Sequence, residues 1–336
     1  MRKNALLLAL LLPLLAGCGA KQPEPLACTP GQEQRLVVYT SHKEEVYTPI
    51  IREFEERTGI WVDVVSGGTN ELLQRLQQEA DAPKADVMFG GGVESLESYQ
   101  DCFSPYICRE AASISQQFQS ESGCWTPFSA LPVVLVYNTK LVAPEALTCW
   151  KDLESPAFRG KIAFADPQIS GSSYTALVTR IQAGGEEACL TGLCAALDGK
   201  QLDSSGAVLT AVADGSCLVG ITLEETALQH IAAGEDIALV YPSDGTSCVP
   251  DGSALIKGAP HSENAKRFLD FTVSADVQAL VGERFCRRAV RADIPADSSL
   301  PPLSDLTLVS YDVEWASKNR DRILSDWAFL LGEVPA

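Results

Sequence analysis

Several residue patterns that mark metal sites and enzymes are missing from this sequence. It has only three histidines, His42, His230 and His261, and no Cys-x-x-Cys pair, so a structural metal site is not expected. No Gly-x-Ser-x-Gly motif is present, which argues against a hydrolase with a nucleophile elbow. The glycine run at 90–92 lacks both a following Gly-Lys-Ser/Thr and a dinucleotide-binding spacing, which excludes a nucleotide loop. Serine, aspartate and His42 are all available, however, so a hydrolase remains the main alternative class.

The sequence also has few basic residues relative to acidic ones. The chain has 26 Lys and Arg against 44 Asp and Glu, and its formal net charge is -18. Nucleic acids and anionic membrane surfaces are repelled by such a surface, so neither is expected as a partner. A small anionic ligand is still compatible, because backbone dipoles can make a site locally electropositive.

Outside the N-terminus, no apolar run is long enough to suggest a membrane span. At the N-terminus, a basic start and the apolar run Ala5–Leu12 precede the tetrad Leu15–Cys18, so residues 1–17 are predicted to be a signal peptide. The tetrad is similar to a bacterial lipobox, in which the cysteine is lipidated; a plain secretory signal is the alternative. We therefore expect a lipid anchor on Cys18, followed by a tether over 18–34 that has too few apolar groups to fold. This places the protein outside the cytoplasm, on the extracellular face of the membrane or in the periplasm.

Ten cysteines remain after Cys18. An even number in an exported chain favours disulfides over free thiols. Cys102 with Cys108 and Cys189 with Cys194 are close enough in sequence to be expected as pairs, and the remaining connectivity is open.

Apolar periodicity predicts an α/β protein. About 300 residues follow the tether, more than one hydrophobic core usually serves, so two lobes are expected. Strands that alternate with helices favour a mainly parallel sheet covered on both faces. Strands are predicted at 36–39, 61–65, 86–89, 131–137, 161–165, 217–222, 237–241 and 253–257, and helices at about 46–58, from 69, at 173–183, 264–282 and 312–331.

Seven short segments together resemble a known family in their order along the chain. They are Leu36–Glu44, Phe54–Val62, Ala85–Gly91, Val136–Thr139, Phe158–Ile162, Asp166–Pro167 and Ile256–Pro260. The set resembles the type II periplasmic solute-binding proteins of ABC importers, in the group that contains ferric-iron-binding, hexose-phosphate-binding and 2-aminoethylphosphonate-binding proteins.

The resemblance implies a two-lobed type II fold, each lobe a mainly parallel sheet flanked by helices, joined by a hinge of crossover strands. Lobe 1 is expected to comprise 35–130 and 253–336 and lobe 2 to comprise 131–252, with the C-terminal helices on either lobe. It also implies a monomer that is not an enzyme, needs no cofactor, binds its ligand between the lobes and delivers it to an ABC permease. A surface lipoprotein with a purely structural role is a third class of function.

The loops at the carboxyl ends of the predicted strands are rich in Gly, Ser and Thr. Ligands of open α/β sheets bind at this edge, where helix N-termini favour anions. Each loop alone fits equally well as a turn or a helix cap, but together they favour binding. The expected ligand contacts are Ser41, His42, Gly68, Thr69, Gly91, Gly92, Ser170, Ser172, Ser173, Ser204, Ser205, Thr222, Glu224, Asp244 and Thr246.

The ligand itself is predicted from what this chain shares with each branch of the family. The ferric-iron branch uses a histidine, a glutamate and two adjacent tyrosines; here His42 is present, but Gly90–Gly91 and 220–225 replace the others. A hard trivalent ion needs several anionic oxygen donors. His42 is therefore expected to be a hydrogen-bond donor in the cleft or merely exposed.

The resemblance thus favours a small organic anion, a sugar phosphate or a 2-aminoethylphosphonate-like compound, with ferric iron as the alternative. Its phosphate is expected near Thr69, Ser172 and Ser173, and its other end near Glu224. For Glu224, a solvated acid at a helix start is the competing interpretation.

Overall fold

The computed structural model describes residues 31–332. The predicted signal peptide, Cys18 and most of the predicted tether lie outside these residues. The tether was expected to extend to residue 34, but the 3-10 turn η1 (Gln32–Gln34) already belongs to the fold. The Asn264 Nδ2 atom donates to the backbone carbonyl of Glu33 at 3.0 Å, which attaches this turn to the folded domain.

The first lobe begins with three strands and two helices, as the apolar pattern predicts. Helix α1 buries Val46, Ile50, Ile51 and Phe54 against the sheet and ends where Gly59 adopts a φ of +69°. The strands lie in parallel, with β1 between β2 and β3. The elements are β1 (Arg35–Thr40), α1 (Glu44–Thr58), β2 (Trp61–Ser66), α2 (Thr69–Gln78), β3 (Val87–Gly92) and the short α3 (Val93–Ser98).

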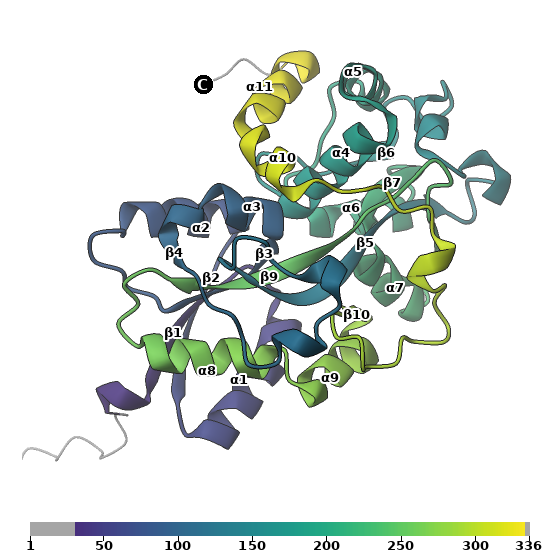
Figure 1. Cartoon of the computed structure of the whole chain (residues 1–336). Coiled ribbons are helices and arrows are strands. Elements are labelled where there is room, and N and C mark those ends of the chain that lie inside the picture. The colour runs from purple at the N-terminus through teal and green to yellow at the C-terminus, as the bar shows by residue number, and fades with distance from the viewer. Residues whose placement is uncertain (1–30, 333–336) are drawn as a thin grey trace, which may run out of the picture.

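Two long strands, β5 (Thr126–Asn138) and β9 (Cys248–Ile256), connect the lobes (Figure 1). The first half of β5 pairs with β9 and with β10 (Arg288–Ala289), and the second half pairs with β7 (Val219–Leu223) and β8 (Ile237–Val240). The strand order is β2-β1-β3-β9-β5-β7-β6, where β6 is Ile162–Ala163; in addition, β4 (Phe103–Ser104) pairs with β9. The two-lobed α/β class is confirmed. The sheet is mixed rather than mainly parallel, because both connecting strands run antiparallel to their neighbours.

The second lobe surrounds a core that contains Trp150, Phe164, Tyr174 and Trp327. Its helices are α4 (Gly171–Gly184), α5 (Glu186–Leu197), α6 (Ser205–Ala213) and α7 (Glu224–Ala232). Strand β5 leaves one set of partners at Pro132 and takes up the other at Val133. The division of the chain into lobes at 130/131 and 252/253 remains a prediction.

Each of the two predicted C-terminal helices is in fact a pair. Residues 264–282 were expected as one helix, but α8 (Ser262–Thr272) and α9 (Ala275–Phe285) are separated at Ser274, whose backbone is extended and whose hydroxyl donates to the Phe271 carbonyl. Likewise α10 (Val313–Lys318) and α11 (Arg320–Leu331) meet at Asn319. Helix α11 packs in the lobe 2 core, whereas the side chain of Val313 in α10 packs against a lobe 1 cluster, so the C-terminal segment contacts both lobes.

The cysteines within residues 31–332 are free thiols: Cys102, Cys108, Cys124, Cys149, Cys189, Cys194, Cys217, Cys248 and Cys286. Neither expected local pair is formed. Cys189 and Cys194 are five positions apart on α5, which separates their Cα atoms by about 8–9 Å, too far for a disulfide. Cys108 instead packs in an apolar cluster with Ile114 and Phe118.

No helix between residues 31 and 332 is both long enough and apolar enough to cross a bilayer.

Candidate functional site

A cavity of about 280 Å³ lies between the lobes, beside the connecting strands. It is bounded by the loops that follow β1, β2 and β3 in lobe 1 and by those that precede α4, α6 and α7 in lobe 2. The structure brings most of the predicted contacts together on its walls: Ser41, His42, Gly68, Thr69, Gly91, Gly92, Ser170, Ser172, Ser204, Ser205 and Thr222.

Besides the short α3, five helices begin at the cavity wall. The N-cap residues of α1, α2, α4, α6 and α7 are Lys43, Gly68, Ser170, Ser204 and Leu223, and each of them lines the cavity. The first turn of a helix has unpaired backbone N–H groups and the positive end of the helix dipole. An anion in this cavity would therefore be surrounded by positive helix ends from both lobes.

Glycines allow the lobe 1 loops to approach one another closely. Gly91 has a φ of +108°, and a Cβ atom there would lie 2.9 Å from Thr69 Cγ2. Gly68 is the N-cap of α2, and Thr69, where a helix was predicted to begin, is the first helical residue and has a buried side chain. Across the cavity, a Cβ atom on Gly171 would lie 3.6 Å from Thr69 Oγ1, so the start of α2 faces the start of α4.

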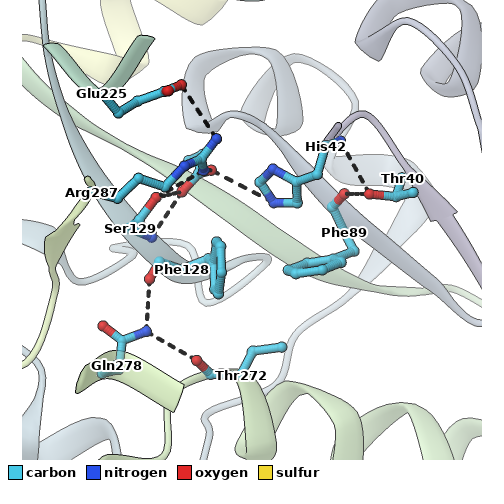
Figure 2. Close-up of polar contacts among 10 residues, drawn as sticks. Thr40, His42, Phe89, Phe128, Ser129, Glu225, Thr272, Gln278 and Arg287 are labelled. Atoms are coloured by element: carbon cyan, nitrogen blue, oxygen red, sulfur yellow. Dashed lines mark hydrogen bonds and ion pairs between the residues drawn. The ribbon is translucent and has the colours of Figure 1, made fainter. Parts of the chain in front are cut away.

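A buried network of charged side chains, drawn in Figure 2, lines the cavity next to the connecting strands β5 and β9, and we call this part of the lining the floor. Asp251 Oδ1 accepts hydrogen bonds from the backbone N–H of Ser129 at 2.8 Å and from its hydroxyl at 2.7 Å. The other carboxylate oxygen of Asp251 accepts from Arg287 Nη1 at 2.7 Å, and Arg287 Nη2 lies 3.4 Å from Glu225 Oε1. His42 Nε2 is 3.6 Å from Asp251 Oδ2. Arg287 thus lies between two carboxylates from different elements.

Burial shifts the pKa values of two groups in this network, His42 and Asp251. It lowers the pKa of His42 well below its ordinary value, and the nearby positive charge of Arg287 lowers it further. Burial raises the pKa of Asp251, an effect opposed by Arg287 and by the hydrogen bonds from Ser129. The imidazole is therefore neutral at pH 7. His42 is 8% exposed, which excludes the second of the two expected alternatives, an exposed histidine.

Four predicted contacts lie outside the cavity lining. Ser173 is buried, and its backbone N–H donates to the hydroxyl of Ser170. Asp244 accepts from the backbone N–H groups of Trp150 and Lys151. Thr246 is fully buried, and its hydroxyl donates to the Val133 carbonyl.

Glu224 is the fourth of these, and it is not a solvated acid. It is 1% exposed, and both of its oxygens accept hydrogen bonds from Arg288 at 2.8 Å. Tyr241 donates a further hydrogen bond to Glu224 Oε1. It is the next residue, Glu225, that lines the cavity.

Some lining residues were missed at the sequence level, among them Glu225, Asp251 and Arg287. Asp251 had a detectable signal, because it is a charged residue within an otherwise apolar strand. Arg287 had no such signal in the sequence. It lies beside the cavity because the chain after α9 runs back to the connecting strands β5 and β9.

Between residues 31 and 332, no three His, Cys, Asp or Glu side chains are grouped so that they could hold a metal ion. Two acidic side chains of the cavity, Glu225 and Asp251, are already paired with Arg287.

Comparisons with known proteins agree on the type of protein and differ on its ligand. Residues 36–284 match the model of the bacterial extracellular solute-binding protein family. The chain is 26% identical over 306 residues to iron uptake protein A1 of Synechocystis sp., which covers 85% of this chain and 84% of that protein. It is 23% identical over 262 residues to a putative 2-aminoethylphosphonate-binding periplasmic protein of Salmonella typhi, covering 73% and 74%. The solved structure of the periplasmic binding protein AfuA from Actinobacillus pleuropneumoniae, with fructose 6-phosphate bound, has a TM-score of 0.82 at 24% identity and covers 88% of this chain and 98% of that one.

Proposed function

Because this chain belongs to the bacterial extracellular solute-binding proteins of ABC importers, we propose that its cargo is a small organic anion, a sugar phosphate or an aminophosphonate. The observation that carries the proposal is the convergence of the N-termini of α1, α2, α4, α6 and α7 on one cavity. Their N–H groups can bind phosphate or phosphonate oxygens without a metal ion.

Hydroxyl groups add to this environment. Ser41, Thr69, Ser172, Ser205 and Thr222 line the same cavity and can donate to the anion's oxygens. The mechanism is capture between the lobes: ligand that contacts helix starts on both lobes favours the closed arrangement, which the permease then recognises. No covalent step is part of this proposal.

Ferric iron is the second candidate, because the iron uptake protein A1 of Synechocystis is among the relatives. The chemistry of the cavity favours it less. A trivalent cation would have to approach Glu225 and Asp251 against the guanidinium of Arg287, which is hydrogen-bonded to Asp251 at 2.7 Å. His42 alone is a poor donor set for a hard cation.

The proposal includes the cellular location. The lipid anchor on Cys18 would hold the protein at the outer face of the cell membrane, as a monomer, beside the permease. Incorporation of labelled fatty acid into the wild type, and its loss in Cys18→Ser, would support the anchor; equal labelling of both would rule it out.

A thermal-shift screen of the purified full-length protein tests the ligand class. The panel contains glucose 6-phosphate, fructose 6-phosphate, 2-aminoethylphosphonate, inorganic phosphate, unphosphorylated sugars and ferric citrate. A ligand at 100 times its dissociation constant stabilises the folded state by about 2.7 kcal/mol, a readily measured shift. Stabilisation by an organic phosphate or phosphonate supports the proposal. Stabilisation by ferric citrate alone would replace it with the iron function.

A further inference from the structure

The charges that line the cavity do not cancel. Lys43 and Arg287 are positive, and Asp203, Glu225 and Asp251 are negative, while burial keeps His42 neutral. The lining thus has one formal negative charge more than positive charges. For a cavity whose helix ends attract anions, this excess of acid needs a separate explanation.

The excess is located at the floor. Arg287 is the cation that touches both Glu225 and Asp251, and each of these three side chains is less than 10% exposed. Asp251 already accepts hydrogen bonds from Ser129 and Arg287 on its two oxygens. The single positive charge of Arg287 therefore faces two buried carboxylates, Glu225 and Asp251. This leaves one formal negative charge without a counter-ion in a region of low dielectric constant.

Glu225 is the carboxylate with unused bonding capacity. Within residues 31–332 its carboxylate is held by one contact, the 3.4 Å approach of Arg287 Nη2. A carboxylate can accept about four hydrogen bonds, and this contact is long for a charged pair. An ammonium group of a ligand would supply both the missing donors and the missing positive charge.

The cavity is therefore bipolar. The starts of α2 and α4, which face each other through Thr69 and Gly171, form a positive end. The floor, with Glu225 and Asp251, forms a negative end, because the full charge of Glu225 exceeds the partial positive charge of the α7 start on which it stands. A ligand that satisfies both ends has an acidic group and a basic group in one small molecule.

We propose that Glu225, oriented by Arg287 and backed by Asp251, is an ammonium subsite, and that the cargo is a zwitterion with a primary amine a few bonds from a phosphonate or phosphate. This inference rests on the proposed function and narrows it. A sugar phosphate without an amine has no positive charge to offset the excess negative charge of the floor. Both an aminophosphonate and an amino phosphate ester have this chemistry, and the binding measurements distinguish these two classes of cargo.

The test combines a protein substitution with a ligand substitution. Isothermal titration of the full-length protein compares 2-aminoethylphosphonate and phosphoethanolamine with propylphosphonate, in which a methyl group replaces the ammonium. Wild type is expected to prefer the better of the two amines over propylphosphonate by about 30-fold, the usual effect of a charge-assisted hydrogen bond. In Glu225→Gln this preference should fall to about 3-fold or less.

Glu187→Gln is the matched control. Glu187 is an exposed acid in the first turn of α5, away from the cavity lining, so this variant changes the net charge equally and should keep the full amine preference. Thermal melting of both variants shows whether they are folded.

The possible outcomes separate this inference from the proposed function. Equal wild-type affinities for the amines and propylphosphonate, or an unchanged preference in Glu225→Gln, would overturn the ammonium subsite while the organic-anion function stands. Tighter binding of glucose 6-phosphate than of either amine would do the same. Binding of ferric iron with no response to any phosphate or phosphonate would overturn both.

Discussion

Arg287 has partners from three different elements. Its guanidinium donates to Ser129 of β5 and Asp251 of β9, and it approaches Glu225 of α7. Arginine does not lose its proton in proteins, so it presents a permanent positive charge and fixed N–H donors to the neighbouring carboxylates. This one side chain therefore determines the electrostatics of the cavity floor.

Removing Arg287 is expected to destabilise the protein strongly. Arg287→Met leaves Glu225 and Asp251 buried without a counter-ion, so the free energy of unfolding in urea should fall by about 3–5 kcal/mol. Arg52→Met is the control, because Arg52 is exposed on α1, and it should change stability by less than about 0.5 kcal/mol. If the two variants have the same unfolding free energy, the buried network does not exist as described.

His42 predicts a pH dependence of stability. Its pKa is lowered in the folded state, so below about pH 6.5 the unfolded chain binds a proton that the folded protein does not. Stability from this residue is therefore fully present above the unfolded pKa and is lost as the pH falls, at up to about 1.4 kcal/mol per pH unit. Urea unfolding at several pH values should show a shallower loss in His42→Asn than in wild type. Parallel curves for the two proteins would mean that His42 titrates normally.

At the scale of the element, the different roles of Glu224 and Glu225 could not be predicted from the sequence. Both residues stand in the first turn of α7, and the sequence alone offers no way to choose between them. Successive residues on a helix point about 100° apart, so only one of them can face the cavity. The structure assigns Glu224 to Arg288 and Glu225 to the cavity, because Arg287 and Arg288 likewise point in different directions after α9.

The local elements, in contrast, are well predicted from the sequence. The buried stripe of α1 and the stop at Gly59 appear where the periodicity places them, because both depend on neighbouring residues only. The antiparallel course of β5 and β9 and the breaks at Ser274 and Asn319 depend on tertiary pairing and were not predicted. The same distinction explains the site. Loop residues at strand ends were found, whereas Asp251 and Arg287, which β9 and the chain after α9 bring to the cavity, were not.

Hydroxyl groups at the N-termini of α2 and α4 are predicted to contribute to ligand affinity. Thr69→Ala at the start of α2 and Ser172→Ala in the first turn of α4 each remove one hydroxyl from the cavity wall. Each is expected to weaken binding of the best phosphonate or phosphate by about 5-fold in calorimetry, the effect of one hydrogen bond, with the melting of the empty protein almost unchanged. Thr210→Ala, on an exposed position of α6, should bind as wild type. Wild-type affinity in both test variants would remove these hydroxyls from the site.

At the scale of the whole molecule, contacts outside the cavity also join the lobes. Asn70 Nδ2, on α2, donates to the backbone carbonyl of Gln168 at 2.6 Å, and Asn70 Oδ1 accepts from Arg320 Nη2 of α11 at 2.8 Å. Thr175 on α4 donates a hydrogen bond to the fully buried Glu94 of α3. The C-terminal segment therefore takes part in holding the lobes together, a role that could not be predicted from its helical pattern.

A substitution at Asn70 tests whether these contacts between the lobes favour the closed arrangement. Asn70→Ala removes both contacts while leaving the cavity lining intact, so the closed arrangement should be less populated and the apparent ligand affinity should fall by about 3–10-fold. Calorimetry measures the affinity, and the neighbouring exposed Glu71→Ala serves as control. An affinity equal to that of wild type would show that these contacts do not contribute to closure.

The central claim is that the converging helix N-termini make this cavity a site for an organic phosphate or phosphonate. The most direct measurement is isothermal titration of the purified full-length protein with 2-aminoethylphosphonate, glucose 6-phosphate and ferric citrate under identical conditions. We expect saturable one-to-one binding of a phosphonate or phosphate compound that does not require a metal ion. Saturable binding of ferric iron without any binding of the two anions would contradict the account.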